Sequence, residues 1–481
     1  MKDPLREAAG GPRLPTQRPN IIYVLSDEHR GQSMSHMGDP NVSTPVLDRL
    51  AAEGVSFSRA YANCPVCTPS RGTIFSGRHA HAGPVQSFWD VYKPAAPSTA
   101  HELRRAGYST CYVGKWHPGV VRDQVPPALR ERPDNPERIN YSSMRRTPED
   151  LRGGFEDWFA FETSSGIFDP RYFHKNEINP RQLHGYTTDA FTDLAIEYLE
   201  EYASDKPLFM VLSVVPPHFP LVVPDKWKRL DPEKVQLRPN VPESSDIPHS
   251  VARFPDLRER MAAYFGMIEN LDWNIGRLID AIDTIPFFDN TLVVYISDHG
   301  EFLGSHGRIE RKELPHEESI RIPGIFRWKD VIPAQGARPE LFSLVDLQKT
   351  VLGLAGMRAP QFDQGFDCSG IILNSSSTPG QDKLLIEMHG SPRWILDEPD
   401  WRAVLTKDWK YVFFDNGKEL LFDLGNDPYE LDDLSQTTRD RVEAMKSMLL
   451  AELERTREPY FDVLIRNGET PDGPVIDVSA I

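Results

Sequence analysis

The chain has 481 residues, with 71 aspartates and glutamates against 54 lysines and arginines, a formal net charge of −17 and 39% hydrophobic residues. This length and hydrophobic content can fill the core of one large α/β domain and of a smaller one. The acidic balance argues against nucleic acid as a substrate or partner, and no apolar run approaches the ~20 residues of a membrane span.

Residues 1–19 are polar, rich in proline and glycine, and contain no apolar signal-peptide core. We therefore expect a cytoplasmic protein, although a chain trimmed of its leader would look the same. The chain has too few cysteines for a disulfide framework; they are Cys64, Cys67, Cys111 and Cys368. Cys64 and Cys67 form a C-x-x-C pair, which could be a redox motif or half of a zinc site, but no second pair completes a zinc site.

The first predicted strand runs from Asn20 to Leu25 and has the continuous apolar pattern of a buried parallel strand. It is followed by Asp27 and Glu28. Carboxylates at this end of a strand point into the crevice where open α/β sheets bind ligands. A helix comes next, with Thr44 as its N-cap and Gly54 as its end.

The most informative stretch is Cys67-Thr68-Pro69-Ser70-Arg71, followed by a helical segment that ends at Gly77. Thr68 can cap this helix and Pro69 can be its first residue. Cys67 would then lie at the positive end of the helix, where negative charge is favoured. Arg71 adds a fixed cation that can bind oxyanion oxygens or steady the group at position 67. The alternative is an ordinary buried cysteine before a helix.

Three further apolar strands each precede polar residues that can carry chemistry. The strand from Ser109 to Val113 precedes Lys115 and His117, the strand from Leu208 to Val215 precedes His218, and the strand from Leu292 to Ser297 precedes Asp298 and His299. Helices are predicted over 189–202 and 257–285, where they would pack on the sheet faces. The stretch 120–181 has weak periodicity and suits a surface loop that shapes a cleft.

The C-terminal part predicts a separate small unit. A cluster of serine, threonine, proline and glycine at 375–380 is the best boundary signal. Beyond it, strands are expected at 384–388, 401–405, 409–414 and 421–424, with a covering helix from about Thr438 to Arg455. We therefore predict an α/β protein with a large, mainly parallel sheet sandwiched by helices over 18–375. A smaller C-terminal α+β subdomain with an antiparallel sheet would occupy 380–481.

Together, the segments around Asp27, Cys67, Lys115, His218, Asp298 and Lys312 resemble the sulfatase family, in the order which that family uses. The resemblance spans about 18–454 and implies the alkaline-phosphatase-like fold. It implies that Cys67 is oxidised to formylglycine by a formylglycine-generating enzyme. It also implies a divalent-metal site formed by Asp27, Glu28, Cys67, Asp298 and His299, with Ca²⁺ expected and Mn²⁺ or Mg²⁺ as alternatives.

The resemblance implies hydrolysis of a sulfate monoester, either a carbohydrate or an aryl sulfate, through a metal-bound formylglycine hydrate derived from Cys67. The implied catalytic residues are Cys67, Arg71, Lys115, His117, His218 and Lys312. Arg71, Lys115 and Lys312 would counter the negative charge. His218, with Lys312, would protonate the leaving oxygen, and His117 would later remove a proton from the nucleophile.

Two residues depart from the usual family pattern. Glu28 stands where an aspartate is common, so it could reach the metal or lie behind it. His299 stands where asparagine is common, and its nitrogen makes manganese more plausible. A phosphonate monoester or phosphodiester hydrolase of the same superfamily therefore remains an alternative, and a noncatalytic binding protein that kept the fold is a weaker one.

Candidate substrate-contacting residues lie in the C-terminal unit and after the signature helix. His389, Arg393, Trp394 and Trp401 could line the cleft and stack on a sugar or an aromatic ring, although aromatic residues near a small sheet are more often core. His79 and His81 follow the signature helix and could approach the pocket. We expect no nucleic acid or membrane partner, and the oligomeric state is not predicted.

Overall fold

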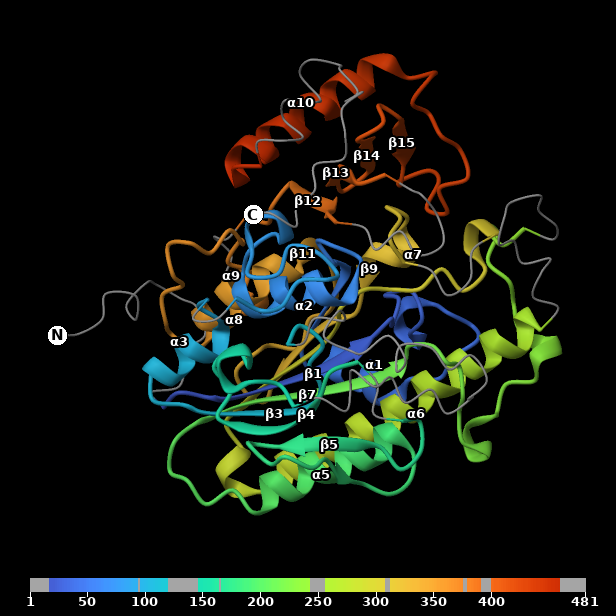
Figure 1. Ribbon diagram of the computed structural model, residues 1–481. Coiled ribbons are helices and arrows are strands. Elements are labelled where there is room, and N and C mark those ends of the chain that lie inside the picture. The colour runs from blue at the N-terminus through green and yellow to red at the C-terminus, as the bar shows by residue number, and fades with distance from the viewer. Residues whose placement is uncertain are drawn as a thin grey trace.

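The computed structural model describes residues 17–93, 96–119, 146–163, 166–242, 256–307, 312–374, 379–390 and 399–458. These ranges contain a large mixed sheet, a small antiparallel sheet and the helices that cover them (Figure 1). The predictions for Arg393, Trp394 and the boundary at 375–378 fall outside the described residues, and so do 120–145 and 459–481.

The first strand in the sequence lies near the centre of the large sheet. Its described strands are β1 (Asn20–Asp27), β2 (Val55–Tyr61), β3 (Ser109–Lys115), β4 (Asp157–Phe161), β5 (Arg171–His174), β6 (Arg181–Gln182), β7 (Leu208–Pro217), β8 (Thr291–Ser297), β9 (Arg321–Ile322), β10 (Gly324–Trp328) and β11 (Gly336–Ser343). The spatial order is β11-β2-β10-β8-β1-β7-β3-β4-β5-β6, with β9 paired to β2. The block β8-β1-β7-β3-β4 is parallel throughout, so the carboxyl ends of its strands share one edge of the sheet.

Helices cover both faces of this sheet, because its central strands are apolar on both sides. One face carries α1 (Pro45–Glu53), α5 (Thr187–Glu200) and α6 (Leu257–Thr284), and the other carries α2 (Cys67–Ser76), α3 (Thr99–Arg105), α8 (Leu347–Leu354) and α9 (Ser369–Ile372) (Figure 1). Along β1, Ile22 and Val24 pack toward the first set, whereas Ile21, Tyr23 and Leu25 pack toward the second. The predicted fold class is confirmed.

The C-terminal unit is a four-stranded antiparallel sheet of β12 (Lys383–Met388), β13 (Trp401–Thr406), β14 (Trp409–Phe414) and β15 (Glu419–Asp423), followed by α10 (Arg439–Thr456). Alternate residues point to opposite faces, as in any strand. Leu385, Val404 and Tyr411 face α10. The opposite face, which includes Ile386 and Trp401, packs against the segment around Cys67. The small sheet therefore forms part of the wall behind the candidate nucleophile.

Two local predictions need correction. Helix α2 begins at Cys67 itself, after Val66, so Thr68 is not its N-cap. Thr44 is the N-cap residue of α1 and Gly54 its C-cap residue, as predicted, but the Thr44 side chain makes no capping hydrogen bond. The carboxylate of Asp272 in α6 accepts from the N–H groups of Val46 and Leu47 instead, so a tertiary contact satisfies the start of α1. The stretch predicted as a loop contains β4 and β5 in its described part, where both strands extend the sheet.

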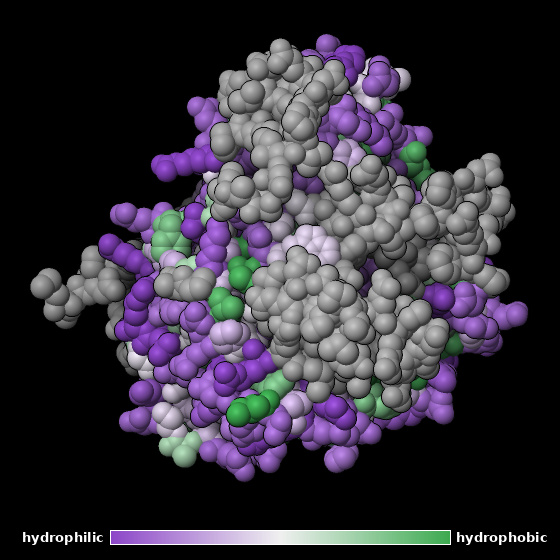
Figure 2. All heavy atoms as spheres, in the orientation of Figure 1, coloured by the Kyte–Doolittle hydropathy of each residue, from purple (hydrophilic) through white to green (hydrophobic). Residues whose placement is uncertain are grey.

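The face of the molecule drawn in Figure 2 is mainly hydrophilic in its described part. Figure 2 shows polar side chains over most of the described part of one face, with small scattered hydrophobic spots. Among the described helices, none combines the length and the apolar character that crossing a membrane requires.

Candidate active site

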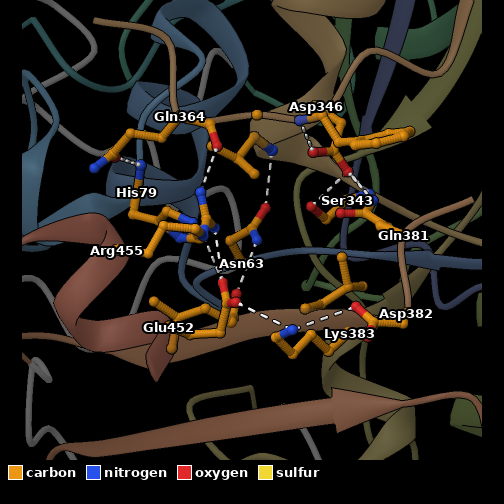
Figure 3. Close-up of a pocket in the computed structure, with 15 residues that line it drawn as sticks. Asn63, His79, Ser343, Asp346, Gln364, Gln381, Asp382, Lys383, Glu452 and Arg455 are labelled. Atoms are coloured by element: carbon orange, nitrogen blue, oxygen red, sulfur yellow. Dashed lines mark hydrogen bonds and ion pairs between the residues drawn. The ribbon is translucent and has the colours of Figure 1, made fainter. Parts of the chain in front are cut away.

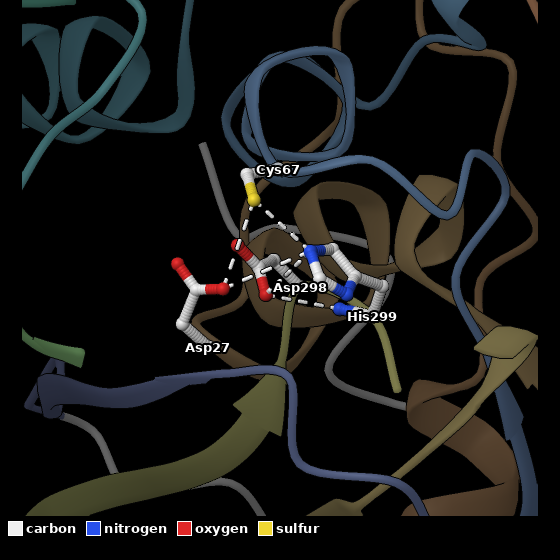
Figure 4. A group of neighbouring side chains, drawn as sticks. All are labelled: Asp27, Cys67, Asp298 and His299. Carbon is white, nitrogen blue, oxygen red and sulfur yellow. Dashed lines mark hydrogen bonds and ion pairs between the residues drawn. The ribbon is translucent and has the colours of Figure 1, made fainter. Parts of the chain in front are cut away.

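The carboxyl ends of β1 and β8 bring two acidic residues beside the start of α2. Ser26 and Ser297 are register partners in these parallel strands, so the next residues, Asp27 and Asp298, emerge at the same edge. Four donor atoms, from Asp27, Cys67, Asp298 and His299, lie within 4.8 Å of one another (Figure 4). The Cys67 Sγ atom is 3.1 Å from His299 Nε2 and 3.7 Å from Asp27 Oδ1. All four side chains are buried.

Arg71 organises the two aspartates from behind. Its Nε donates to Asp298 Oδ2 at 3.0 Å and its Nη2 to Asp27 Oδ2 at 3.2 Å. The Oδ1 atoms of the same carboxylates face His299 Nε2, each at 3.7 Å. Burial alone would raise the pKa of Asp27, but Lys115 and the other nearby cationic groups hold it well below its ordinary value. Both aspartates thus keep one oxygen on Arg71 and turn the other toward Cys67.

These donors fit a divalent cation. His299 Nδ1 lies 3.0 Å from the carbonyl oxygen of Gly300, an arrangement that places the proton on Nδ1 and leaves the Nε2 lone pair facing the cluster. Two carboxylate oxygens, one imidazole nitrogen and the group at position 67 converge in a buried space. Such a mixed oxygen and nitrogen set is compatible with Ca²⁺, Mg²⁺ or Mn²⁺.

Glu28 lies outside this four-donor cluster. Its Oε1 accepts from Lys312 Nζ at 2.6 Å and lies 3.6 Å from His218 Nε2. Burial opposes ionisation, yet the neighbouring His218 and Lys312 lower the pKa of Glu28. The extra methylene therefore carries the carboxylate toward the groups that the sequence assigns to the leaving oxygen.

Lys312 connects the predicted nucleophile to the predicted acid. Its Nζ also lies 3.3 Å from Cys67 Sγ and 3.0 Å from His218 Nε2, so its three N–H bonds have three acceptors. Burial alone would lower the pKa of Lys312, but Cys67 and Glu28 raise it well above the ordinary value. His218 is a quarter exposed, and its Nδ1 lies 2.6 Å from Phe219 O.

Lys115 and His117 come from the end of β3. The ammonium of Lys115 pairs with Asp27 Oδ2, and its carbonyl oxygen accepts from Arg71 Nη1 at 2.8 Å. His117 packs edge-on against Phe88 with 5.4 Å between ring centroids. Burial, and then the charge of Lys115, hold the pKa of His117 well below its ordinary value, so its imidazole is neutral.

Several residues support the site through contacts that are not apparent from the sequence. Ser213 Oγ accepts from Arg71 at 2.9 Å, and Ser70 Oγ donates to Asp298 O at 2.6 Å. Trp401, considered above as a cleft residue, is fully buried and donates its indole N–H to Glu313 O at 2.8 Å. A serine inside the apolar run of β7 was a usable signal for Ser213. No local pattern could connect Trp401 with Glu313.

A second group of possible metal ligands, from His306, Glu318 and Glu430, lies between α7 (Glu317–Ile320) and the C-terminal sheet. Its carboxylates already have cationic partners. Arg238 lies 3.2 Å from Glu318 Oε1, and the ammonium of Lys410 pairs with Glu430. Burial nevertheless raises the pKa of Glu430 to about 8, and we interpret this group as a structural network of ion pairs and hydrogen bonds.

His79 and His81 lie beyond the far end of α2, about 15 Å along the helix from Cys67. His81 pairs with Glu387 at 2.7 Å. His79 lines a polar cavity of about 220 Å³ at the junction of the two sheets (Figure 3). Neither histidine contacts the four-donor cluster. All four cysteines, including Cys64, are buried free thiols.

Comparisons with known proteins identify the class of protein. The family model "Sulfatase" matches residues 19–357, and the model "N-sulphoglucosamine sulphohydrolase, C-terminal" matches residues 304–459. An ulvan-active sulfatase from Formosa agariphila is 31% identical over 450 residues, which cover 91% of this chain and 82% of that protein.

Solved structures agree with this result. The crystal structure of yidJ from Bacteroides fragilis superposes with a TM-score of 0.80 at 26% identity, covering 94% of this chain and 98% of that one. A second structure, solved in complex with its substrate D-glucosamine-2-N,6-O-disulfate, has a TM-score of 0.78 at 22% identity and covers 93% of this chain and 99% of that one.

The fold and the cluster at its carboxyl edge define an enzyme of the alkaline-phosphatase-like type. Within that type, the chain belongs to the sulfatase family. It is a sulfuric ester hydrolase, as the motifs implied.

Proposed function

We propose that this sulfatase hydrolyses the sulfate ester of a carbohydrate and uses a formylglycine formed from Cys67. Asp27, Asp298, His299 and the residue at position 67 would hold one divalent cation, with calcium expected and magnesium or manganese as alternatives. The roles assigned below to individual residues belong to this proposal.

One observation carries the proposal. The two aspartates share their oxygens between Arg71 on one side and the group at position 67 on the other. A buried cysteine in an ordinary core would not need a carboxylate, an imidazole and an ammonium within about 4 Å of its sulfur. Those distances are 3.7 Å to Asp27, 3.1 Å to His299 and 3.3 Å to Lys312. This environment suits a nucleophile that develops negative charge.

When present, the cation would supply Lewis-acid polarisation and the hydrated aldehyde would supply a hydroxyl nucleophile. The chain's own groups do the rest. The ammonium groups of Lys115 and Lys312 stabilise the negative charge of the sulfate oxygens. Arg71 has its donors directed at Asp27, Asp298 and neighbouring oxygens, so it orients the aspartates and has no exposed surface with which to contact substrate.

Proton transfer is assigned to the two histidines. The Lys312 ammonium lies 3.0 Å from His218 Nε2, and the His218 side chain is a quarter exposed, so the pair is placed to pass a proton to the leaving oxygen. The lowered pKa of His117 keeps its imidazole neutral and able to accept a proton when sulfate is released. Separate residues therefore serve the two half-reactions.

A carbohydrate substrate is supported by two similar proteins. One is named for N-acetylglucosamine-6-O-sulfatase activity, in Bacteroides thetaiotaomicron, and another was solved with D-glucosamine-2-N,6-O-disulfate. Sugar alkoxides are poor leaving groups, so their departure requires protonation of the leaving oxygen. The paired His218 and Lys312 would supply that acid. Aryl sulfates remain useful test substrates.

The first test is peptide mass spectrometry on the segment that contains Cys67, from protein made with a formylglycine-generating enzyme. We expect the aldehyde or its hydrate, and loss of sulfate release in Cys67→Ala. Cys64→Ala is the matched control, because Cys64 is an equally buried thiol in the same C-x-x-C pair. A thiol that stays intact in an active enzyme would contradict the formylglycine mechanism.

The same preparation can test the choice of ester. Release of sulfate from 4-nitrophenyl sulfate and a sulfated glucosamine is compared with hydrolysis of a phosphonate monoester and a phosphodiester. Higher kcat/KM for the phosphorus esters would favour the alternative hydrolase. Elemental analysis of the purified protein measures which cation is bound and at what stoichiometry.

A further inference from the structure

The backbone beside Lys312 makes an unusual turn. Glu313 has φ of 62°, a value that side-chain-bearing residues rarely adopt, and the N–H of Leu314 donates to Lys312 O at 2.6 Å. A hydrogen bond from residue i+2 to residue i around a positive φ is a strained form of γ-turn. Such strain persists only where surrounding contacts hold it in place.

Two contacts from distant segments hold this turn. The N–H of Glu313 donates to Pro65 O at 3.4 Å, which ties the turn to the segment just before Cys67. The carbonyl oxygen of Glu313 accepts from Trp401 Nε1 at 2.8 Å. Trp401 lies in β13 of the C-terminal sheet and has no exposed surface. Its indole is fixed by the packing of that sheet, so the bond has a rigid donor.

The end of the same segment is also anchored to the small sheet. The N–H of Glu317 donates to Glu430 Oε2 at 2.7 Å, and Lys410 Nζ lies 3.4 Å from Glu317 Oε1. Lys312 is thus followed by a short segment with both ends fastened to the C-terminal sheet. Its side chain is left to reach Cys67 Sγ and His218 Nε2.

We propose that Trp401 is a positioning residue for the reaction, because its indole N–H holds the strained turn at Glu313 and thereby aims Lys312 at the leaving-group side of the site. This inference rests on the proposed function, in which Lys312 and His218 act on the leaving oxygen. The C-terminal sheet is then part of the catalytic apparatus, although none of its side chains touches the substrate in this role.

The expected effect depends on the substrate. Loss of the indole hydrogen bond relaxes the turn and lets the Lys312 ammonium drift from His218. A poor leaving group needs that pair, whereas 4-nitrophenolate leaves with little protonation. Trp401→Phe keeps a buried aromatic ring and removes the N–H. We expect about a tenfold lower kcat/KM for 4-methoxyphenyl sulfate, which is the size of effect typical of one lost hydrogen bond. For 4-nitrophenyl sulfate we expect less than a threefold change in kcat/KM.

The matched control is Trp328→Phe. Trp328 is equally buried, and its Nε1 donates to Asn290 Oδ1 at 3.0 Å, but it lies in β10, away from the turn. This variant should lose stability without changing the ratio of the two kcat/KM values. Equal losses on both substrates in Trp401→Phe, or the same ratio change in Trp328→Phe, would overturn the proposal.

A second measurement does not depend on activity. Hydrogen exchange of the Leu314 amide, followed by mass spectrometry, should become at least tenfold faster in Trp401→Phe and stay unchanged in Trp328→Phe. Unaltered exchange in Trp401→Phe would refute the role of Trp401 even in an active enzyme. If the parent releases no sulfate from any ester, the proposed function fails, and the exchange result still decides whether Trp401 holds the turn.

Discussion

Replacement of Arg71 by methionine tests how the two aspartates are kept together. Arg71, Asp27 and Asp298 have no exposed surface, and the guanidinium donates to both carboxylates at 3.0 and 3.2 Å. Methionine preserves most of the apolar volume and removes the charge. The variant therefore leaves two buried carboxylates with Lys115 as the main remaining cation.

The size of the effect follows from this geometry. Removal of one partner from a buried ion pair typically costs 3–5 kcal/mol, because the other charge stays buried without compensation. Lys115 still neutralises part of the charge on Asp27. We therefore expect a loss of about 4 kcal/mol in the free energy of unfolding of metal-free protein, and a smaller loss when calcium is present, since the cation restores positive charge between the same carboxylates.

The assay is urea unfolding of parent and variant, each with EDTA and with excess calcium. Arg152→Met is the control, because Arg152 is also buried but donates to the carbonyl oxygens of Thr147 and Lys175. It should cost about 1–2 kcal/mol, with no difference between EDTA and calcium. A loss below about 1 kcal/mol in Arg71→Met, or a loss that calcium does not reduce, would refute the reasoning.

Three shorter predictions follow from other features. In Gly114→Ala the new Cβ would lie 1.9 Å from Ser213 O at a φ of 104°. Urea unfolding should therefore show that the free energy of unfolding falls by roughly 3 kcal/mol or more. The control is Gly107→Ala, where φ is 92° and no atom lies within 4 Å, and its expected loss is about 1 kcal/mol. Chelation by EDTA should lower the thermal midpoint of the parent, whereas an unchanged midpoint would argue against a cation that supports the fold. Burial lowers the pKa of His79 to about 3, so below pH 6.5 the unfolded chain binds the extra proton and the free energy of unfolding falls as pH falls, by up to roughly 4 kcal/mol near pH 3. His79→Gln should flatten this acid limb in a pH series of urea melts.

Most of the sheet could be predicted because its central strands are continuous apolar runs. β1, β7 and β8 are buried on both faces, and burial on both faces leaves a clear pattern in the sequence. β4 is short and lies beside a polar stretch, so its pattern was weak. β10 was not predicted either, because the charged Arg327 interrupts its apolar pattern, although in the fold this arginine is buried and paired with Asp283.

The residues that meet in the four-donor cluster could be identified from the sequence, but the arrangement of the groups around them could not. Asp27, Cys67 and Asp298 were found from strand ends and from the signature pentapeptide. The preference of Glu28 for Lys312 depends on the meeting of two side chains 284 residues apart. A contact between residues so far apart in the sequence leaves no local periodicity or motif from which it could be predicted. The same limit applies to Trp401, whose burial was expected but whose partner was not.

The order of strands in the large sheet also determines when, during synthesis of the chain, Cys67 can become buried. β1 pairs with β7 and β8, so the edge that buries Cys67 cannot close until Ser297 has been synthesised, about 230 residues after Cys67. At the usual rates of synthesis this interval is on the order of 10–50 s. In the folded chain Cys67 is 1% exposed. Under the proposed function, the enzyme that modifies this cysteine therefore has its best access to the nascent chain, and faster translation or earlier closure of the sheet would leave more of the protein unconverted.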